Sequence, residues 1–193
     1  MEVVIIKYNA GNIKSVEFAL ERIGINATVS DDKEIIQRAD KIIFPGVGEA
    51  SSAMSYLRQY GLDEIIKELK QPVLGICLGM QLLCQHSEEG NTECLGIFDT
   101  QVKRFGDELK VPQIGWNKLS ETSGPLFRDM QGESFCYFVH SYYAGLCADT
   151  IAVTEYGLKF SSALSKRNFY GVQFHPEKSA EAGEAILHNF LTL

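Results

Sequence analysis

The first 45 residues alternate short apolar runs with segments whose apolar residues recur at helical spacing. The runs at 3–7, 26–29 and 41–44 predict strands, and the continuously apolar first run favours a strand buried on both faces. Apolar spacing predicts a helix across 13–23 and a shorter one around 35–39. The order strand, helix, strand, helix, strand is typical of a doubly wound parallel sheet.

Residues that favour helix ends flank these segments. Asn12 has the position of an N-cap for the first helix, and Gly24 follows its last apolar residue as a C-cap glycine does. Ser-Asp-Asp at 30–32 precedes the second helix. Two further helices are expected around 54–60 and 63–69, separated by Gly61, before an apolar run at 73–76 predicts a fourth strand.

The pattern changes after His86. A polar loop is expected at 87–92, and beyond it the apolar segments are short, rich in β-branched and aromatic residues, and separated by Gly, Asp and Asn. They predict hairpins and meanders with strands at 100–105, 116–119, 134–139, 151–156 and 169–174, before a closing helix from about Ala180. We therefore expect an α/β fold in one domain, 1–193: an open, twisted, mostly parallel sheet with flanking helices, plus a smaller antiparallel β section.

Composition narrows the classes of function. The net charge is −7, from 18 basic and 25 acidic residues without a basic run, which argues against a nucleic-acid partner. No apolar stretch approaches the roughly 20 residues of a membrane span, and the first residues do not resemble a signal peptide. Five cysteines without CxxC spacing or a histidine cluster indicate a reducing cytoplasm, no metal site, and thiols that are mostly buried and inert.

Candidate chemistry centres on Cys77, in the segment Gly-Ile-Cys-Leu-Gly at 75–79. The segment follows a predicted strand and precedes residues that favour a helix, which is the nucleophile-elbow pattern with Cys in place of Ser. The turn is so tight that a Cβ at either flanking glycine would collide with neighbouring backbone. A helix N-terminus also favours the thiolate. The competing interpretation is a buried structural cysteine between packing glycines.

A second loop, Pro-Gly-Val-Gly at 45–48, ends the third strand at the same edge of the sheet. In open α/β sheets ligands bind at the carboxyl ends of the strands, and glycines let the backbone approach them closely. An ordinary turn also explains this loop when it is taken alone.

His175 is the candidate base. It follows the predicted strand 169–174, and Pro176 then ends strand pairing, so that Glu177 can reach back to the far ring nitrogen. His-Pro-Glu alone fits a simple turn, but together with the elbow it favours a Cys77–His175–Glu177 triad. His140 is expected to be a structural histidine with its hydrogen bonds satisfied.

These segments together resemble the triad, or class I, glutamine amidotransferases, and within them the glutaminase subunits of imidazole glycerol phosphate synthase. The resemblance spans nearly the whole chain, and one departure is Gln113, where the family usually has His. It implies a flavodoxin-like core. The matching segments, in chain order, are residues 8–12, 45–48, 75–81, 112–117, 138–142 and 173–179.

The resemblance implies hydrolysis of glutamine to glutamate and ammonia. Cys77 would attack the carboxamide carbon, His175 would accept and return the proton, and Glu177 would orient His175. The oxyanion would be held by the backbone N–H groups of Leu78 and Val47. The family positions that hold glutamine correspond to Gly48, Gln81, Glu89, Ser141 and Tyr142. No metal or organic cofactor is implied.

The resemblance also implies a partner, a (β/α)8-barrel cyclase that receives ammonia through a channel. With it the complex would make imidazole glycerol phosphate and aminoimidazole carboxamide ribotide in histidine biosynthesis. Asn12, Trp116, Tyr137 and Lys178 match positions near that heterodimer interface. A solvated surface cation is the competing interpretation of Lys178.

Three alternatives stay open from the sequence. The chain fits an amidotransferase subunit that serves amidination of surface-sugar precursors, or a stand-alone cysteine amidohydrolase of the same fold. A non-catalytic docking subunit is a third, although the intact Cys77, His175 and Glu177 speak against it.

Overall fold

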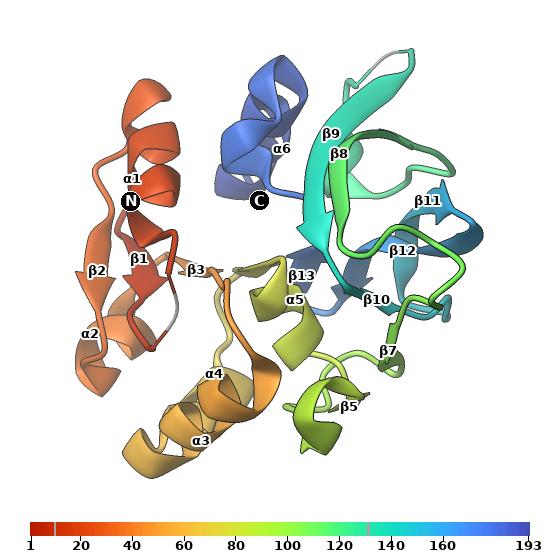
Figure 1. The fold of residues 1–193 in the computed structure, drawn as a ribbon. Coiled ribbons are helices and arrows are strands. Elements are labelled where there is room, and N and C mark those ends of the chain that lie inside the picture. The colour runs from red at the N-terminus through yellow and green to blue at the C-terminus, as the bar shows by residue number, and fades with distance from the viewer. Residues whose placement is uncertain (10, 131) are drawn as a thin grey trace.

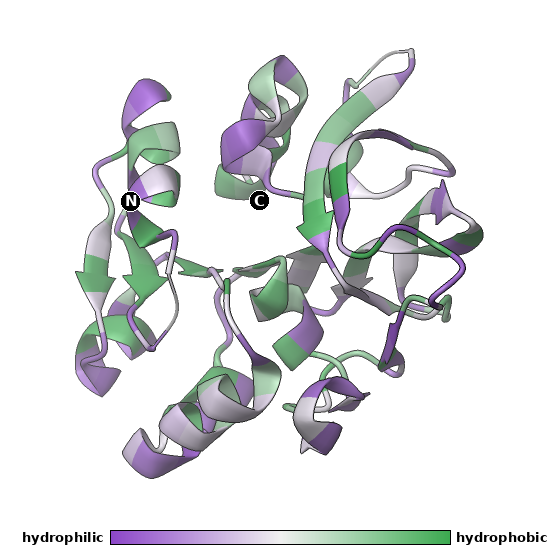
Figure 2. Cartoon of the chain, viewed as in Figure 1, coloured by the Kyte–Doolittle hydropathy of each residue, from purple (hydrophilic) through white to green (hydrophobic). Residues whose placement is uncertain are grey.

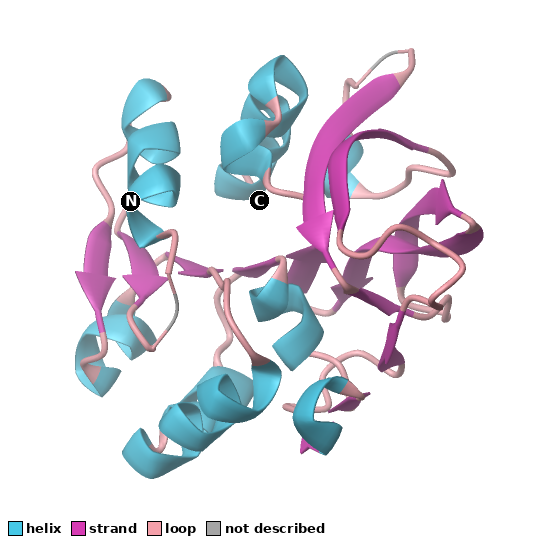
Figure 3. Cartoon of the chain, viewed as in Figure 1, coloured by secondary structure: helices cyan, strands magenta, loops and turns pink. Residues whose placement is uncertain are grey.

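One large sheet crosses the molecule, with helices on both of its faces (Figures 1 and 3). The computed structural model describes residues 1–9, 11–130 and 132–193. The strand order is β2-β1-β3-β4-β13-β12-β10-β7-β5-β6, and β11 pairs with β12. The parallel half comprises β1 (Val3–Ile6), β2 (Thr28–Ser30), β3 (Lys41–Phe44), β4 (Val73–Ile76) and β13 (Phe169–Val172).

The other half is mostly antiparallel. It comprises β5 (His86–Ser87), β6 (Thr92–Glu93), β7 (Gln101–Arg104), β10 (Tyr142–Ala144), β11 (Thr150–Tyr156) and β12 (Leu158–Lys166). A separate antiparallel pair, β8 (Gln113–Leu119) and β9 (Ser134–His140), stands beside the C-terminal helix (Figure 1). The predicted fold class, a mostly parallel sheet with a smaller antiparallel section, is confirmed.

The helices divide between the two faces of the sheet. On one face lie α1 (Ile13–Arg22) and α6 (Ala180–Leu191); on the other lie α2 (Lys33–Arg38), α3 (Ala50–Tyr60), α4 (Leu62–Glu68) and α5 (Leu78–Leu82) (Figure 1). Short 3₁₀ turns occupy η1 (Glu89–Asn91), η2 (Pro125–Phe127) and η3 (Pro176–Lys178). Among the described residues, none of these helices has the length and apolar character needed to cross a membrane.

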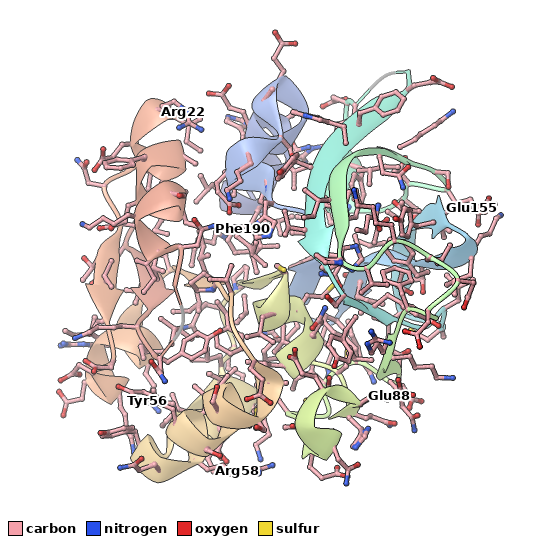
Figure 4. The ribbon with its side chains drawn as sticks, viewed as in Figure 1. Arg22, Tyr56, Arg58, Glu88, Glu155 and Phe190 are labelled. Atoms are coloured by element: carbon pink, nitrogen blue, oxygen red, sulfur yellow. The ribbon has the colours of Figure 1, made fainter. Side chains whose placement is uncertain are left out.

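Alternate side chains along the buried strands pack into two hydrophobic cores, one on each face of the sheet. In β1, Val4 and Ile6 pack with α2–α5, whereas Val3 and Ile5 pack with α1 and α6. Each buried side chain of this kind contributes roughly 1.5–3 kcal/mol relative to an exposed one. Figure 2 shows the apolar colour concentrated on the central strands and the inner helix faces, and Figure 4 shows Phe190 inside the packing and Arg58 at the periphery.

Most helix-end predictions are confirmed. Asp32 caps α2, with its Oδ1 accepting from the Glu34 and Ile35 backbone N–H groups at 2.9 and 3.1 Å. Gly24 adopts φ 81° directly after the C-cap of α1. Asn12 stands at the predicted N-cap position of α1, with φ 71°, but its side chain makes no capping bond. The Asn12 side chain is instead engaged at the site described below.

The position of β13 is the feature of the fold that brings the site together. The predicted meander is present, and β13 pairs antiparallel with β12, but its other edge pairs parallel with β4, with Val172 opposite Ile76. The carboxyl ends of β4 and β13 therefore lie side by side, although they are about a hundred residues apart in sequence. The predicted polar loop at 87–92 is partly wrong, because β5 and β6 extend into it at both ends.

Candidate active site

Cys77 occupies a strained turn between β4 and α5. Its φ of 54° and ψ of −110° are unfavourable for a side chain with a Cβ. A Cβ at Gly79 would lie 1.9 Å from the Phe44 carbonyl oxygen, and one at Gly75 would lie 2.8 Å from the Met80 nitrogen. The predicted requirement for both glycines is thus confirmed. The Cys77 N–H donates to the Val172 carbonyl at 2.8 Å, which ties the elbow directly to β13.

His175 follows β13 and reaches the elbow from the neighbouring strand end. Its backbone N–H donates to the Tyr137 carbonyl at 2.9 Å, and the Ser179 hydroxyl donates to its carbonyl at 2.6 Å. Its ring Nδ1–H donates to Glu177 Oε1 at 2.8 Å, and both side chains are buried. Glu177 therefore fixes the tautomer and directs Nε2 away from itself.

The charges of Cys77, His175 and Glu177 are coupled. Burial alone would lower the pKa of His175, but its interactions with the Cys77 sulfur and with the Glu177 carboxylate outweigh burial and raise that pKa above its ordinary value. Asn12 Nδ2 donates to the same Glu177 oxygen at 2.5 Å. Sulfur, imidazole and carboxylate are thus arranged to carry a proton from Cys77 to a stabilised imidazolium.

A cavity of about 330 Å³ opens over the sulfur. This volume lies at the small end of the roughly 300–1,000 Å³ typical of small-molecule sites. Ten of the candidate site residues line it. Glu177 lies behind His175, and three others lie outside the cavity: Asn12, Trp116 and Tyr137. These ten are Val47, Gly48, Cys77, Leu78, Gln81, Glu89, Ser141, Tyr142, His175 and Lys178.

The loop at 45–48 closes the oxyanion position in this structure. The Leu78 N–H donates to the Gly46 carbonyl at 3.2 Å. Because a trans peptide points its C=O and N–H in opposite directions, the Val47 N–H is turned away from the Leu78 N–H. Tyr8 Oη holds the preceding Pro45 carbonyl at 2.5 Å. Gly48 has φ +129°, and the position that a Cβ would take there is open.

Polar groups also line the cavity. Gln81 Nε2 donates to the Tyr142 carbonyl at 3.0 Å and to Gln173 Oε1 at 2.9 Å, so both amide hydrogens are used and Oε1 remains as an acceptor. Glu89 is half-buried, and its Oε2 accepts from the Ala50 N–H at 2.8 Å. Burial, and to a smaller extent Glu49, raises the pKa of Glu89.

Two residues have contacts that sequence reasoning missed. The expectation that His140 is fully bonded is wrong: Nδ1 donates to the Tyr142 carbonyl at 2.7 Å, but Nε2 is buried without a partner among the described residues. Burial lowers the pKa of His140 to about 4, with a smaller contribution from His175. Gln173, fully buried, places Nε2 3.6 Å from the Cys77 sulfur. In the sequence, the one sign of a role for Gln173 was its position between a predicted strand and His175.

Three of the four remaining thiols match the expectation of inert cysteines. Cys84 and Cys136 are buried and Cys94 is half-buried, and burial raises the pKa of each, to about 12 for Cys94 and Cys136. Such thiols stay protonated and unreactive. The described residues contain no group of three His, Cys, Asp or Glu side chains that could hold a metal.

The four residues expected near a partner lie on one side of the site. Trp116 on β8 is 54% exposed and pairs across the strand with Tyr137, with ring centroids 6.0 Å apart. Lys178 is exposed at the cavity rim, and Asn12 reaches Glu177 from the start of α1.

Comparisons with known proteins agree with this geometry. The class-I glutamine amidotransferase family matches residues 4–193. The chain is 59% identical over 196 residues to the imidazole glycerol phosphate synthase subunit HisH of Bacteroides fragilis, with all of both chains covered. It is 47% identical to the protein of the same name from Idiomarina loihiensis, covering 100% of this chain and 98% of that protein.

The solved structures agree on the fold. A structure described as a glutamine amidotransferase has a TM-score of 0.77 at 21% identity, with 100% of this chain and 98% of that chain covered. The structure of PurLQS from Thermotoga maritima has a TM-score of 0.75 at 15% identity, with 99% and 97% covered. With a family match across nearly its whole length, the chain belongs to the class-I glutamine amidotransferases.

Proposed function

We propose that this chain is the glutaminase subunit of a cytoplasmic imidazole glycerol phosphate synthase, which hydrolyses glutamine and passes ammonia to a cyclase. The observation that carries the proposal is the meeting of Cys77, His175 and Glu177 at the adjoining ends of β4 and β13. The names of the full-length relatives support the choice of pathway.

The chemistry follows from the positions of these atoms. The Cys77 thiol gives its proton to His175 Nε2, since Nδ1 is bonded to Glu177, and the sulfur attacks the carboxamide carbon. The tetrahedral intermediate collapses as the C–N bond breaks, and His175 returns the proton to the leaving nitrogen, which departs as ammonia. Water then attacks the thioester with His175 as base, and the C–S bond breaks to release glutamate and restore the thiol.

The oxyanion would be stabilised by the Leu78 and Val47 N–H groups, each worth roughly 3–4 kcal/mol at the transition state. At rest the Leu78 N–H donates to the Gly46 carbonyl, so this donor is occupied, and the Val47 N–H of the same peptide points away from the oxyanion position. The Gly46–Val47 peptide must therefore rotate before catalysis. The flanking glycines make this rotation inexpensive, and free glutaminase activity is low until the partner induces it.

Glutamine occupies the cavity with its carboxamide over Cys77. Glu89 and Gln81 Oε1 are acceptors suited to the α-ammonium group, and Gly48, Ser141 and Tyr142 supply backbone and side-chain polar groups along the same walls.

The cyclase, which is a (β/α)8 barrel, docks over Asn12, Trp116, Tyr137 and Lys178. Support comes from exposed apolar side chains on the same strand pair, Ile114 at 61% and Phe135 at 46% exposure, which are unusual on a surface without a partner. Ammonia that escaped into neutral water would be protonated and lose its nucleophilicity, so a sheltered transfer between the two proteins is required.

The test is glutamate release by the pure chain with and without a purified histidine-pathway cyclase. We expect slow hydrolysis alone and strong stimulation by the cyclase, together with covalent labelling of Cys77 by a glutamine-mimicking diazo ketone. Cys77→Ala abolishes glutamine use while ammonia-dependent synthesis by the complex survives. Equal activity with and without the cyclase identifies a stand-alone amidohydrolase, and stimulation only by a surface-sugar amidination partner identifies that pathway.

A further inference from the structure

The amide of Gln173 has only one orientation compatible with its neighbours. The Tyr142 carbonyl accepts hydrogen bonds and cannot donate them, so the Gln81 atom facing it at 3.0 Å is nitrogen. That same Gln81 nitrogen lies 2.9 Å from the Gln173 side chain, which must therefore present its oxygen there. The other end of the Gln173 amide, 3.6 Å from the Cys77 sulfur, is consequently its NH₂ group.

The position of Gln173 allows little rearrangement of this chain of bonds. Gln173 is fully buried, and its backbone N–H donates to the Ser162 carbonyl at 2.9 Å, directly after β13. Gln81 is also buried, on α5. The thiol has its own acceptor in the Val139 carbonyl at 3.8 Å, so the sulfur lies between an acceptor for its hydrogen and a donor to its lone pairs.

The geometry points to Gln173 as a further catalytic residue, one that donates an N–H to the Cys77 sulfur and stabilises its thiolate. An amide N–H is a donor without a charge, so it stabilises the anion and cannot give up its proton to the sulfur. Gln81, which lines the substrate cavity, fixes the amide orientation. This inference rests on Cys77 being the nucleophile of the proposed function.

Several titratable groups also lie around Cys77, and a test must separate them from Gln173. His175 approaches from the residue before η3, and Tyr8 lies near the sulfur, beyond the end of β1. Glu89, His140 and Lys178 line the same cavity. All five stay in place when Gln173 alone is changed, so a difference between the wild-type chain and a Gln173 variant isolates the amide.

The experiment is the pH profile of Cys77 alkylation by iodoacetamide, a neutral reagent, followed by mass spectrometry of the Cys77 peptide. Gln173→Met keeps the length and removes the donor. We expect the midpoint of the profile to move to higher pH by about one unit, so that the rate at any pH below both midpoints falls about tenfold, the size expected for one hydrogen bond to a charged group. The plateau at high pH stays near that of the wild-type chain, whereas a purely structural defect lowers the plateau as well.

Gln71→Met is the matched control. Gln71 also donates through Nε2, at 2.9 Å to the carbonyl of the buried residue Ile36, but it precedes β4 and lies at the opposite end of that strand from Cys77. Its profile should superimpose on that of the wild-type chain. A Gln173→Met profile that also superimposes on the wild-type profile overturns the assignment.

A second measurement does not depend on the variant folding. In the ¹⁵N-labelled wild-type chain, the Gln173 side-chain amide signal should shift as Cys77 ionises, and the shift should be absent in Cys77→Ser. Identical titration of this signal in both chains overturns the assignment. Iodoacetamide and the amide signal both report on the thiolate without glutamine, so either result stands even if glutaminase activity is absent.

Discussion

At the scale of single residues, Gly79 shows how backbone contacts dictate the sequence of the elbow. Gly79→Ala would place a methyl group 1.9 Å from the Phe44 carbonyl oxygen, and only movement of β3 or α5 can relieve that clash. We expect a loss of about 2–4 kcal/mol in the free energy of unfolding, measured by urea denaturation. Gly96→Ala is the control: φ there is +69° with open space, so we expect only about 1–2 kcal/mol of left-handed strain. Equal losses would contradict the steric explanation.

Burial of His140 should make the free energy of unfolding depend on pH. Its folded pKa, about 4, lies below the ordinary value of 6.5, so the unfolded chain binds the proton more readily. Stability is therefore lost as the pH falls from 6.5 to 4, by up to about 3 kcal/mol. His140→Asn, which can still donate to the Tyr142 carbonyl, should lose correspondingly less over this range when unfolding is measured by denaturant at each pH. Parallel curves for the two chains would show that His140 is not held neutral.

The residues of the triad were accessible from sequence because each stands in a motif with a chemical requirement. Cys77 lies between two glycines, and Glu177 lies two residues after a histidine. The orientation of Gln173 was not accessible in this way, because it depends on a contact with Gln81, about ninety residues away. Nor was the state of His140 Nε2, which lacks a partner among the described residues because of how the ring is buried, and no local pattern encodes that burial.

At the scale of elements, local periodicity predicted the β-α-β-α-β start, because each strand there is followed by a helix with its own apolar stripe. It could not place β13. That strand pairs antiparallel with β12 and parallel with β4, and the second pairing joins segments about a hundred residues apart. The elbow around Cys77 and the His-Pro-Glu segment, rather than periodicity, predicted that Cys77 and His175 meet.

The loop at 45–48 is expected to need free rotation of its peptides for activation by the cyclase. Gly48 has φ +129°, a conformation that a β-branched side chain rarely adopts, although nothing occupies the space around it. Gly48→Val should therefore restrict rotation of the neighbouring peptide without a steric clash at rest. We expect loss of most of the cyclase-induced stimulation of glutamate release.

Alkylation of Cys77 serves as the control in the same variant. The elbow is built by β4 and α5, so the thiol should react with iodoacetamide at close to its rate in the wild-type chain. Full stimulation of Gly48→Val by the cyclase would rule out the rotating-peptide switch. Gly46→Val is a poorer test, because a side chain at Gly46 would collide with Leu78 and Tyr8 and perturb the fold.

At the scale of the whole molecule, both cores support the site. The core beneath α2–α5 holds the elbow helix, whereas the other core, which includes Cys77 itself, joins α1 and α6 to β8 and β9. η3, which carries Glu177, lies next to both α1 and β9. The backbone N–H of His175 donates to the carbonyl of Tyr137 on β9. A partner that binds β8 and β9 can therefore shift the segment that orients His175 by moving β9.

The exposed indole of Trp116 is expected to contribute to binding of the cyclase rather than to stability of the fold. Trp116 is 54% exposed, so Trp116→Ala should change the free energy of unfolding by less than about 1 kcal/mol. Buried against a partner, an aromatic side chain of this size is commonly worth about 2 kcal/mol or more, so we expect the Kd for the cyclase to rise about thirtyfold or more by calorimetry. Tyr60→Ala is the control, because Tyr60 is 50% exposed on α3, across the sheet. Unchanged affinity in Trp116→Ala, or an equal loss in Tyr60→Ala, would place the docking surface elsewhere.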